Sequence, residues 1–306
     1  MTVHELHPEP GSTTDVFDRD APPALAVDPG DTVVVRSLDA SGYLERQRSP
    51  GEQRPTMFAE RRGHCLTGPI EVRGAEVGNV LAVHIVSANP GDWGWTVAGA
   101  KDNALNRALG LTGAPSWLLW EIDAAAGTAT NDRGHTVRTS PFLGVIGMPP
   151  NEPGQHSTIP PRAAGGGNID CRDLTAGATL FLPVTVPGAL LHLGDGHAAQ
   201  GDGEVCGTAI ECPMTTVVTL DIVTEAPVPG PHATTPSGRV TFGFDTDLNA
   251  AMTQALTAMV TWMRNLYDLD RGTATALASL VVDLRITQVV NETWGVHAVL
   301  AHGAVL

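Results

Sequence analysis

The stretch VDPGDTVVV, residues 27–35, places a Pro-Gly turn directly before a run of β-branched residues. The same order of glycine-containing turn and apolar strand returns in GAEVGNVLAV, residues 74–83, and in LTAGATLFL, residues 174–182. Glycine permits the positive φ that such turns need, and β-branched side chains fit a pleated, half-buried surface. Several short strands spaced in this way predict a sandwich or a barrel. Common β-turn sequences explain the recurrence as well as an internal duplication does.

Two helices are expected near the C-terminus. Asp247 can cap the first helix, and the apolar residues that follow are spaced by three and four, which gives one buried stripe. The stripe consists of Leu248, Met252, Ala255, Leu256, Met259, Met263 and Leu266. A second, shorter helix is predicted for residues 273–284, and strands for residues 286–290 and 296–300.

The chain is therefore expected to be mainly β, with a small α+β part at its end. We divide it into an N-terminal mainly β part (1–140), a central β part (141–230) and a C-terminal α+β part (231–306). A long Gly- and Pro-rich loop is predicted for residues 154–167, and such loops within compact domains are often functional.

The charge balance excludes some classes of partner. The chain has 306 residues, with 18 Lys and Arg against 33 Asp and Glu, so its formal net charge is −15. Nucleic acids and anionic membranes both require a basic surface, so neither is expected as a partner. No stretch has the ~18 apolar residues of a transmembrane helix, and the polar start does not resemble a signal peptide. A cytoplasmic protein that handles a small molecule or a metal ion is expected.

The densest polar cluster is GDGHAAQGDGE, residues 194–204. On an extended chain residues two apart share a face, so Asp195 and His197 are expected to point at one centre. Asp202 and Glu204 repeat that spacing after a glycine-rich turn. Crowded carboxylates need a cation or shared protons, which favours a metal or catalytic site. A solvated acidic hairpin, or a turn stiffened by calcium without catalysis, accounts for the spacing equally well.

Three further residues stand in unusual places. Asp170 follows a glycine run and has no evident structural duty. Glu211 is expected to end a strand after the apolar pair 209–210. His64 lies alone in a predicted turn, where a structural role is the more common one.

Several mechanisms lack their motifs. The chain contains no G-x-S-x-G, H-E-x-x-H or G-x-x-x-x-G-K-[ST] sequence. Lys101 is the only lysine and has no serine motif beside it, which argues against lysine-based amidase mechanisms. Cys171 and Cys206 flank the acidic cluster, but neighbouring acids disfavour a reactive thiolate. The four cysteines show no C-x-x-C spacing, so neither a zinc finger nor a disulfide scaffold is indicated.

With these residues in view, the sequence resembles the acetamidase/formamidase family. The resemblance is densest in PFLGVIGMPP, residues 141–150, and in residues 166–211, which include the acidic cluster. The closing segment DLRITQVVN, residues 283–291, also resembles the family. Two segments depart from it, the Arg-rich residues 36–62 and the residues between 92 and 116. Both could reshape a substrate pocket.

The resemblance implies hydrolysis of formamide or acetamide to carboxylate and ammonia. It also implies a jelly-roll-like sandwich or barrel core, a homodimer or higher homo-oligomer, and a divalent metal, with zinc expected and calcium as the alternative. Glycine and alanine spacers in residues 194–204 suggest a compact pocket, hence a preference for short amides. The runner-up is a non-catalytic, metal-stiffened β-sandwich that binds a small polar ligand.

The residue pattern and the resemblance together suggest roles for nine residues. The expected metal ligands are Asp170, Asp195, His197 and Glu211. Glu204 is expected to be the general base and proton donor, with catalytic support from Asp202 and from His64. Gln200 and Asn168 are expected to bind the substrate.

Overall fold

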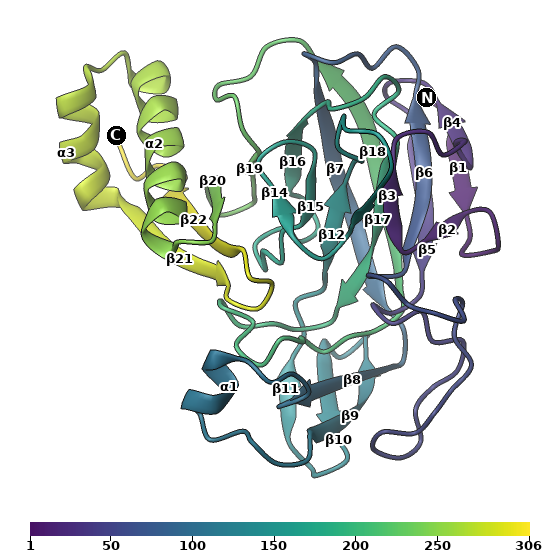
Figure 1. Ribbon diagram of the computed structural model, residues 1–306. Helices are drawn as coiled ribbons and strands as arrows, with labels where there is room; N and C mark the ends of the chain where they lie inside the picture. The colour runs from purple at the N-terminus through teal and green to yellow at the C-terminus, as the bar shows by residue number, and fades with distance from the viewer.

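The computed structural model describes residues 1–306 as three helices and 22 short strands, arranged mainly as two facing sheets (Figure 1). The larger sheet has nine strands and takes members from all three parts of the chain. In spatial order they are β1 (Val3–Leu6), β5 (Thr32–Ser37), β18 (Met214–Val223), β7 (Val80–Pro90), β16 (Thr179–Pro183), β19 (His232–Thr234), β20 (Gly238–Asp245), β22 (Trp294–Ala301) and β21 (Val282–Gln288).

The second sheet packs on the first and carries the strands nearest the predicted site. Its spatial order is β14 (Pro161–Arg162), β15 (Gly166–Asn168), β12 (Phe142–Gly147), β17 (Leu191–His197), β6 (Leu66–Val72) and β2 (Thr13–Thr14), with β4 (Leu25–Val27) also paired to β6. Every residue of β12 and of β17 is buried, so these two strands form the rigid centre of the molecule.

A smaller sheet forms a separate lobe below the sandwich in Figure 1, next to the short helix α1 (Ala104–Ala108). Its strands are β11 (Thr136–Arg138), β10 (Thr128–Asn131), β9 (Ser116–Asp123) and β8 (Trp93–Ala98). The last two strands, β13 (Gln155–Ser157) and β3 (Val16–Asp18), pair with each other. The predicted loop 154–167 is therefore interrupted by short strands, because edge pairing satisfies its backbone groups.

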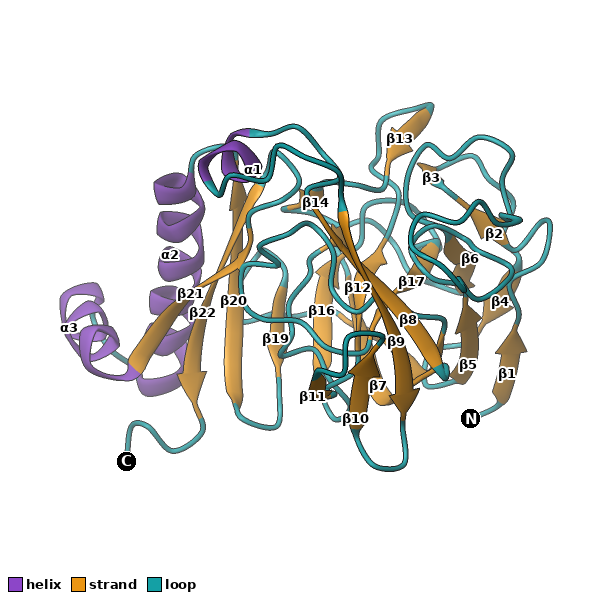
Figure 2. Ribbon diagram, turned by 90° about the horizontal axis from the view of Figure 1, so that it is seen from below, coloured by secondary structure: helices purple, strands orange, loops and turns teal.

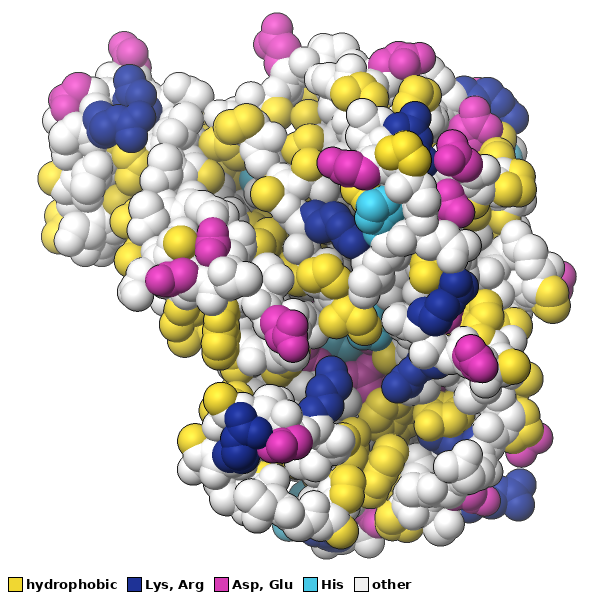
Figure 3. Space-filling view, in the orientation of Figure 1, with side chains coloured by type: hydrophobic (Ala, Val, Ile, Leu, Met, Phe, Trp, Pro, Cys, Tyr) yellow, Lys and Arg dark blue, Asp and Glu magenta, His cyan; other side chains and the backbone are white.

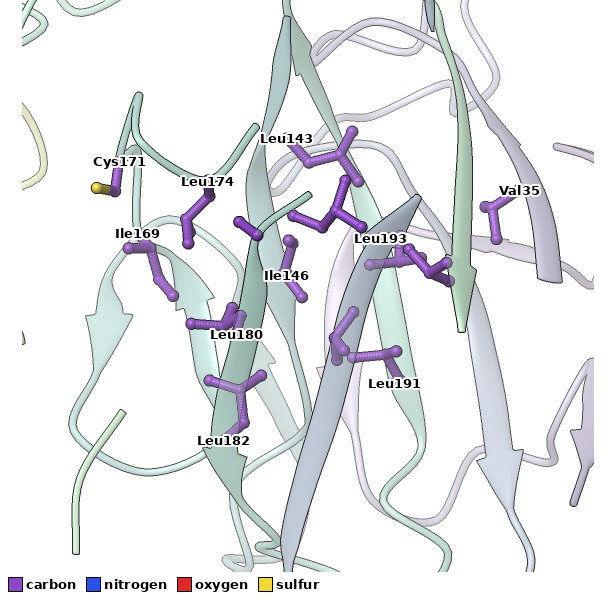
Figure 4. Packing of buried hydrophobic residues seen from close by; sticks show 14 of the residues in the cluster. Val35, Leu143, Ile146, Ile169, Cys171, Leu174, Leu180, Leu182, Leu191 and Leu193 are labelled. Carbon is purple, nitrogen blue, oxygen red and sulfur yellow. The ribbon is translucent and has the colours of Figure 1, made fainter. Parts of the chain in front are cut away.

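One apolar core fills the space between the two large sheets (Figure 4). Ile146 and Leu193 enter it from β12 and β17, and Leu180 and Val35 enter it from the facing sheet. The expected mainly β fold is confirmed as a sandwich. The barrel alternative is wrong, because the sheets end in unjoined edge strands.

The three recurring turn-and-strand units become β5, β7 and β16, and all three lie in the nine-stranded sheet. In each unit a turn glycine has positive φ: Gly30 (87°), Gly78 (104°) and Gly177 (88°). The local pattern thus predicted both the strands and the backbone conformation before them.

The C-terminal part contains the two predicted helices, α2 (Leu248–Tyr267) and α3 (Arg271–Val281), which lie beside one end of the large sheet (Figure 2). The Asp247 side chain caps α2 by accepting hydrogen bonds from two backbone amides. The second helix ends earlier than predicted because residues 282–284 already pair with β22. Helix α1 was not predicted. None of the helices is both long and apolar enough to cross a membrane.

Helix α2 approaches β20 so closely that position 243 must lack a side chain. A Cβ on Gly243 would lie 2.0 Å from the Ala251 carbonyl oxygen and 2.8 Å from the Ala255 nitrogen. We predict that Gly243→Ala lowers the free energy of unfolding by about 1–3 kcal/mol, since overpacking displaces the helix. Urea unfolding measures this. Gly230→Ala, which meets no atom within 4 Å, is the control and should change it by less than about 0.5 kcal/mol.

Candidate active site

A pocket of about 500 Å³ opens between the small lobe and the sandwich. Figure 3 shows acidic side chains at the bottom of a hollow, with basic side chains on either side of it. Its lining includes Asp195, Glu204 and Glu211, together with His64 and Asn168. Residues of the acidic cluster 194–204 and residues predicted separately, such as His64 and Glu211, therefore line the same pocket.

Strand β17 carries Asp195 and His197 to the floor of this pocket. The two side chains point the same way, as their spacing predicted, and His197 Nε2 lies 3.4 Å from Asp195 Oδ1. The Phe142 ring meets the His197 ring edge-on, at 5.1 Å between centroids, and fixes the plane of the imidazole. Both side chains are almost fully buried.

Gly144 on β12 makes room for the cluster. A Cβ at this position would lie 2.4 Å from Asp195 Oδ2, 2.7 Å from Asp170 Oδ1 and 2.9 Å from His197 Cε1. Asp170 is held there because its backbone amide and that of Ile169 both donate to the Gly144 carbonyl. Three ionisable groups thus converge over one bare stretch of backbone. Gly144 was missed as a functional residue, because nothing in its local sequence indicates what lies above it.

Glu211 is the fourth predicted ligand, and it also faces His197. It does not end a strand as predicted; instead its backbone forms isolated bridges to Trp95 and to His197. Glu211 Oε1 accepts a hydrogen bond from the Ala209 amide at 2.9 Å, and Oε2 lies 3.4 Å from His197 Nε2. The carboxylate is therefore aimed at the imidazole nitrogen that Asp195 also faces.

Glu204 joins the cluster, but Asp202 does not. Potential ligand atoms of Glu204, His197 and Glu211 lie within 4.8 Å of one another, as do those of Asp170, Asp195 and His197. Asp202 is exposed and does not line the pocket. The expected alternation fails there because Gly203 (φ 97°) and Glu204 (φ 44°) are left-handed, so the chain is not extended. The predicted catalytic support from Asp202 is therefore not favoured by its position.

The backbone of the cluster is locally strained. Asp170 (φ 53°), Asp195 (φ 59°) and Glu204 (φ 44°) all adopt left-handed conformations, which are rare for residues other than glycine. Such conformations cost about 1–3 kcal/mol each and persist where the surrounding structure determines them. The fold thus holds these three carboxylates at some expense in stability.

Gln200 sets the protonation of His197. The Gln200 amide nitrogen donates to the Asp170 carbonyl at 2.8 Å, so its oxygen faces His197 Nδ1 at 2.8 Å. An amide oxygen only accepts, and Nδ1 must therefore carry a hydrogen. This leaves Nε2 of the neutral ring as a lone pair that faces the carboxylates. Gln200 lies outside the pocket lining, so the position fits a positioning role rather than the predicted substrate contact.

Several buried polar atoms of the floor have no hydrogen-bond partner. They are Asp170 Oδ1, His197 Nε2, Glu211 Oε2 and Asn168 Oδ1. Unsatisfied buried atoms are costly, and three of these belong to the proposed ligand set. Imidazole and carboxylate donors within this distance of one another suit a divalent cation, and the residues present therefore fit a metal.

The charges of the floor also favour a cation. Burial, aided by the charge of Asp195, raises the pKa of Asp170 to about 8. Burial and the Asp170 carboxylate raise the pKa of Glu204 well above its usual value, and burial raises the pKa of Glu211 to about 7. Burial opposes charge on His197, but Glu211 and Asp195 raise its pKa well above the usual value. Against the effect of burial, the His64 and His197 imidazoles lower the pKa of Asp195. The four buried carboxyl groups thus have two imidazoles as nearby counter-charges.

The remaining predicted residues and one unpredicted residue complete the lining. His64 is half-buried, and burial lowers its pKa although the Asp195 carboxylate acts in the opposite direction. Asn168 ends β15 at the floor. Asn291, which was not predicted, donates to Asp170 Oδ2 at 3.4 Å. Burial raises the pKa of Cys171, in agreement with the expected absence of a reactive thiolate.

The two segments that depart from the family form the outer pocket. Tyr43 lies in the segment 36–62 and Trp95 in the segment 92–116. Trp117 is the first residue after the second segment. The glycine and alanine spacers of residues 194–204, from which a compact pocket was expected, do not line the pocket themselves.

The buried carboxylate of Asp39 holds Tyr43 and Trp95 of the outer pocket in place. The Trp95 indole donates to Asp39 Oδ2 at 2.6 Å, and the Tyr43 amide donates to Oδ1 at 2.9 Å. Burial raises the pKa of Asp39 to about 6, although both hydrogen bonds act to lower it.

The raised pKa of Asp39 predicts a pH-dependent stability. In the unfolded chain this carboxyl loses its proton at lower pH than in the folded protein, so between about pH 4 and 6 the folded state binds more protons. The free energy of unfolding therefore falls as pH rises through that window, by up to about 3 kcal/mol. Asp39→Asn should remove this fall, while its lost hydrogen bond costs the same at each pH. Urea unfolding at several pH values tests this, with exposed Asp20→Asn as the control; parallel curves for wild type and Asp39→Asn would contradict it.

Comparison with known proteins agrees with the geometry. The Acetamidase/Formamidase family model matches residues 4–156 and 152–300. A protein of Schizosaccharomyces pombe assigned as a formamidase is 30% identical over 293 residues, covering 74% of this chain and 71% of that one. The acetamidase of Mycolicibacterium smegmatis is 28% identical, and the chain spans 61% of its length. The crystal structure of an acetamidase from Bacillus halodurans superposes with a TM-score of 0.86 at 30% identity, covering 97% of both chains. The family resemblance and the amidohydrolase class expected from it are confirmed: the chain belongs to the Acetamidase/Formamidase family.

Proposed function

We propose that this pocket hydrolyses the C–N bond of short linear amides such as formamide and acetamide, with a divalent cation bound at its floor. The observation that carries the proposal is the convergence of Asp170, Asp195 and His197 over Gly144, where Asp170 Oδ1 and His197 Nε2 have no hydrogen-bond partner. The relatives named formamidase and acetamidase support the choice of substrate.

The residues that would hold the cation are Asp170, Asp195, His197 and Glu211. A bound divalent cation polarises a carbonyl and lowers the pKa of water, and both effects help attack on an unreactive amide. The imidazole among the donors favours zinc, with calcium as the alternative.

The chain itself supplies proton transfer and orientation. Water forms the new C–O bond as the C–N bond breaks, and the proton that the water loses passes to Glu204 and then to the departing nitrogen, which leaves as ammonia. Asn168 Oδ1, buried and without a partner, suits an amide N–H of the substrate. His64 Nδ1 is likewise unpartnered and suits the role of orienting the substrate. Association into a homo-oligomer stays a prediction from the family resemblance.

If His197 is a ligand, His197→Ala should lose bound metal and amidase activity together. It should also change stability, because the remaining carboxylates face one another without their counter-charge. Elemental analysis, ammonia release from acetamide and thermal unfolding on one preparation measure all three. His84→Ala, an exposed histidine outside the pocket, is the control. Full metal content in His197→Ala would remove His197 from the ligand set.

If Glu204 moves the proton, Glu204→Gln should keep fold and metal but lose about 10²–10⁴-fold in kcat, the usual contribution of general acid–base catalysis. Exposed Glu76→Gln is the matched control and should retain wild-type turnover. A non-catalytic, metal-stiffened sandwich predicts no ammonia release by any of these proteins. Loss of metal from Glu204→Gln would instead make Glu204 a ligand and leave Asp170 or Glu211 as the better base.

A further inference from the structure

The pocket is much larger than the proposed short amides require. About 500 Å³ lies within the range of sites that bind drug-sized ligands, whereas acetamide adds only a methyl group to the amide. The ionisable cluster occupies the floor. The remaining space lies toward the mouth and is bordered by Tyr43, Trp95 and Trp117. An amide that reacts at the floor would therefore direct its acyl group along this aromatic wall.

The wall is held in place before any ligand binds. Trp95 is fixed by its 2.6 Å hydrogen bond to buried Asp39, and the Trp117 ring lies against it at 5.6 Å between centroids. Tyr43 and Trp95 meet nearly at right angles with 6.3 Å between ring centroids, and the Arg54 guanidinium covers one face of the Tyr43 ring, 3.4 Å from its centroid. A preorganised aromatic surface loses little side-chain entropy when a ligand stacks on it.

Trp117 is half-buried and lines the pocket, so part of its ring area faces the space that a ligand would fill.

The charges at the mouth limit what this wall can bind. Arg61, Arg62 and Lys101 all line the pocket. Arg62 is paired with Asp15 at 2.7 Å and Arg61 contacts Ser41, while Lys101 is exposed. Aromatic walls also bind organic cations, but the positive charges of Arg61 and Lys101 beside this one oppose a cationic acyl group, and the carboxylates lie at the floor instead. The surface suits an uncharged, planar apolar group.

We propose that the preferred substrates are primary amides whose acyl part carries an aryl or arylalkyl group, which packs against half-buried Tyr43 and Trp117, with buried Trp95 behind them, while the carboxamide reaches Glu204 and Asn168. This inference rests on the proposed amide hydrolysis and adds the class of acyl group. Short amides occupy the floor alone and gain nothing from the wall.

The test compares ammonia release from phenylacetamide and from acetamide by the purified, metal-containing protein. We expect kcat/KM for phenylacetamide to exceed that for acetamide by at least about tenfold, the lower end of what one buried methylene contributes. Trp117→Ala and Tyr43→Ala should each lower the ratio of the two kcat/KM values about tenfold or more. Trp294→Ala, another half-buried tryptophan but outside the pocket, should leave the ratio unchanged. Two variants are used so that misfolding of one does not decide the result.

The outcomes separate this inference from the proposed function. If acetamide is hydrolysed with the higher kcat/KM, or if neither wall variant changes the ratio, the aryl class is wrong and amide hydrolysis stands. If no amide is hydrolysed but phenylacetamide changes the tryptophan fluorescence of the wild type and not of Trp117→Ala, the ligand class stands and the reaction is wrong. If neither hydrolysis nor binding is observed, both proposals fail.

Discussion

Four carboxyl groups and one imidazole meet in a single buried space, three of these groups directly over Gly144, and the rest of the structure serves to hold them there. Buried like charges repel one another strongly and are tolerated only when paired with a counter-charge. The approach is so close that even a methyl group at position 144 would overlap two of the carboxylates. Left-handed backbone at Asp170, Asp195 and Glu204 adds to the cost. A cation that binds the folded state but not the unfolded chain repays part of this cost, which couples metal binding to folding.

The sandwich provides the rigidity that such a cluster needs. Strands β12 and β17 are buried throughout and pair with each other, so their side chains cannot relax away from the floor. Glu204, by contrast, lies on a turn that is held by residues far away in the sequence. Backbone hydrogen bonds join Gly203 to Thr287 and Val289 at the end of β21. The central and C-terminal parts of the chain are therefore linked at the site, where the proposed proton carrier Glu204 lies on a turn and the proposed ligands Asp195 and His197 lie on strand β17.

The sequence predicted the features that depend on local geometry. A turn glycine before β-branched residues predicted β5, β7 and β16, and the two-residue period of a strand placed Asp195 beside His197. The same rule failed at Asp202, because Asp195 and His197 lie in strand β17 whereas residues 202–204 lie in a turn. The roles of Gly144, Asn291 and Asp39 had no local signal, since each acts on residues far away in the sequence. The size of the pocket could not be predicted for a related reason: spacers near the cluster say nothing about walls that come from residues 36–62 and 92–117.

The distribution of charge in the pocket affects how the product of the proposed reaction leaves. A neutral amide enters a pocket whose floor is acidic, and hydrolysis turns its acyl part into a carboxylate beside Asp195 and Glu211. Like charges at this distance repel, and the repulsion is strongest where water is scarce. Arg61 and Lys101 of the pocket lining are also favourable charges for the new anion. In a chain of net charge −15 this local basic rim opposes the overall field. With the proposed cation at the floor, the product carboxylate faces that cation as well as Asp195 and Glu211, so the balance of all charges at the floor sets how readily it leaves.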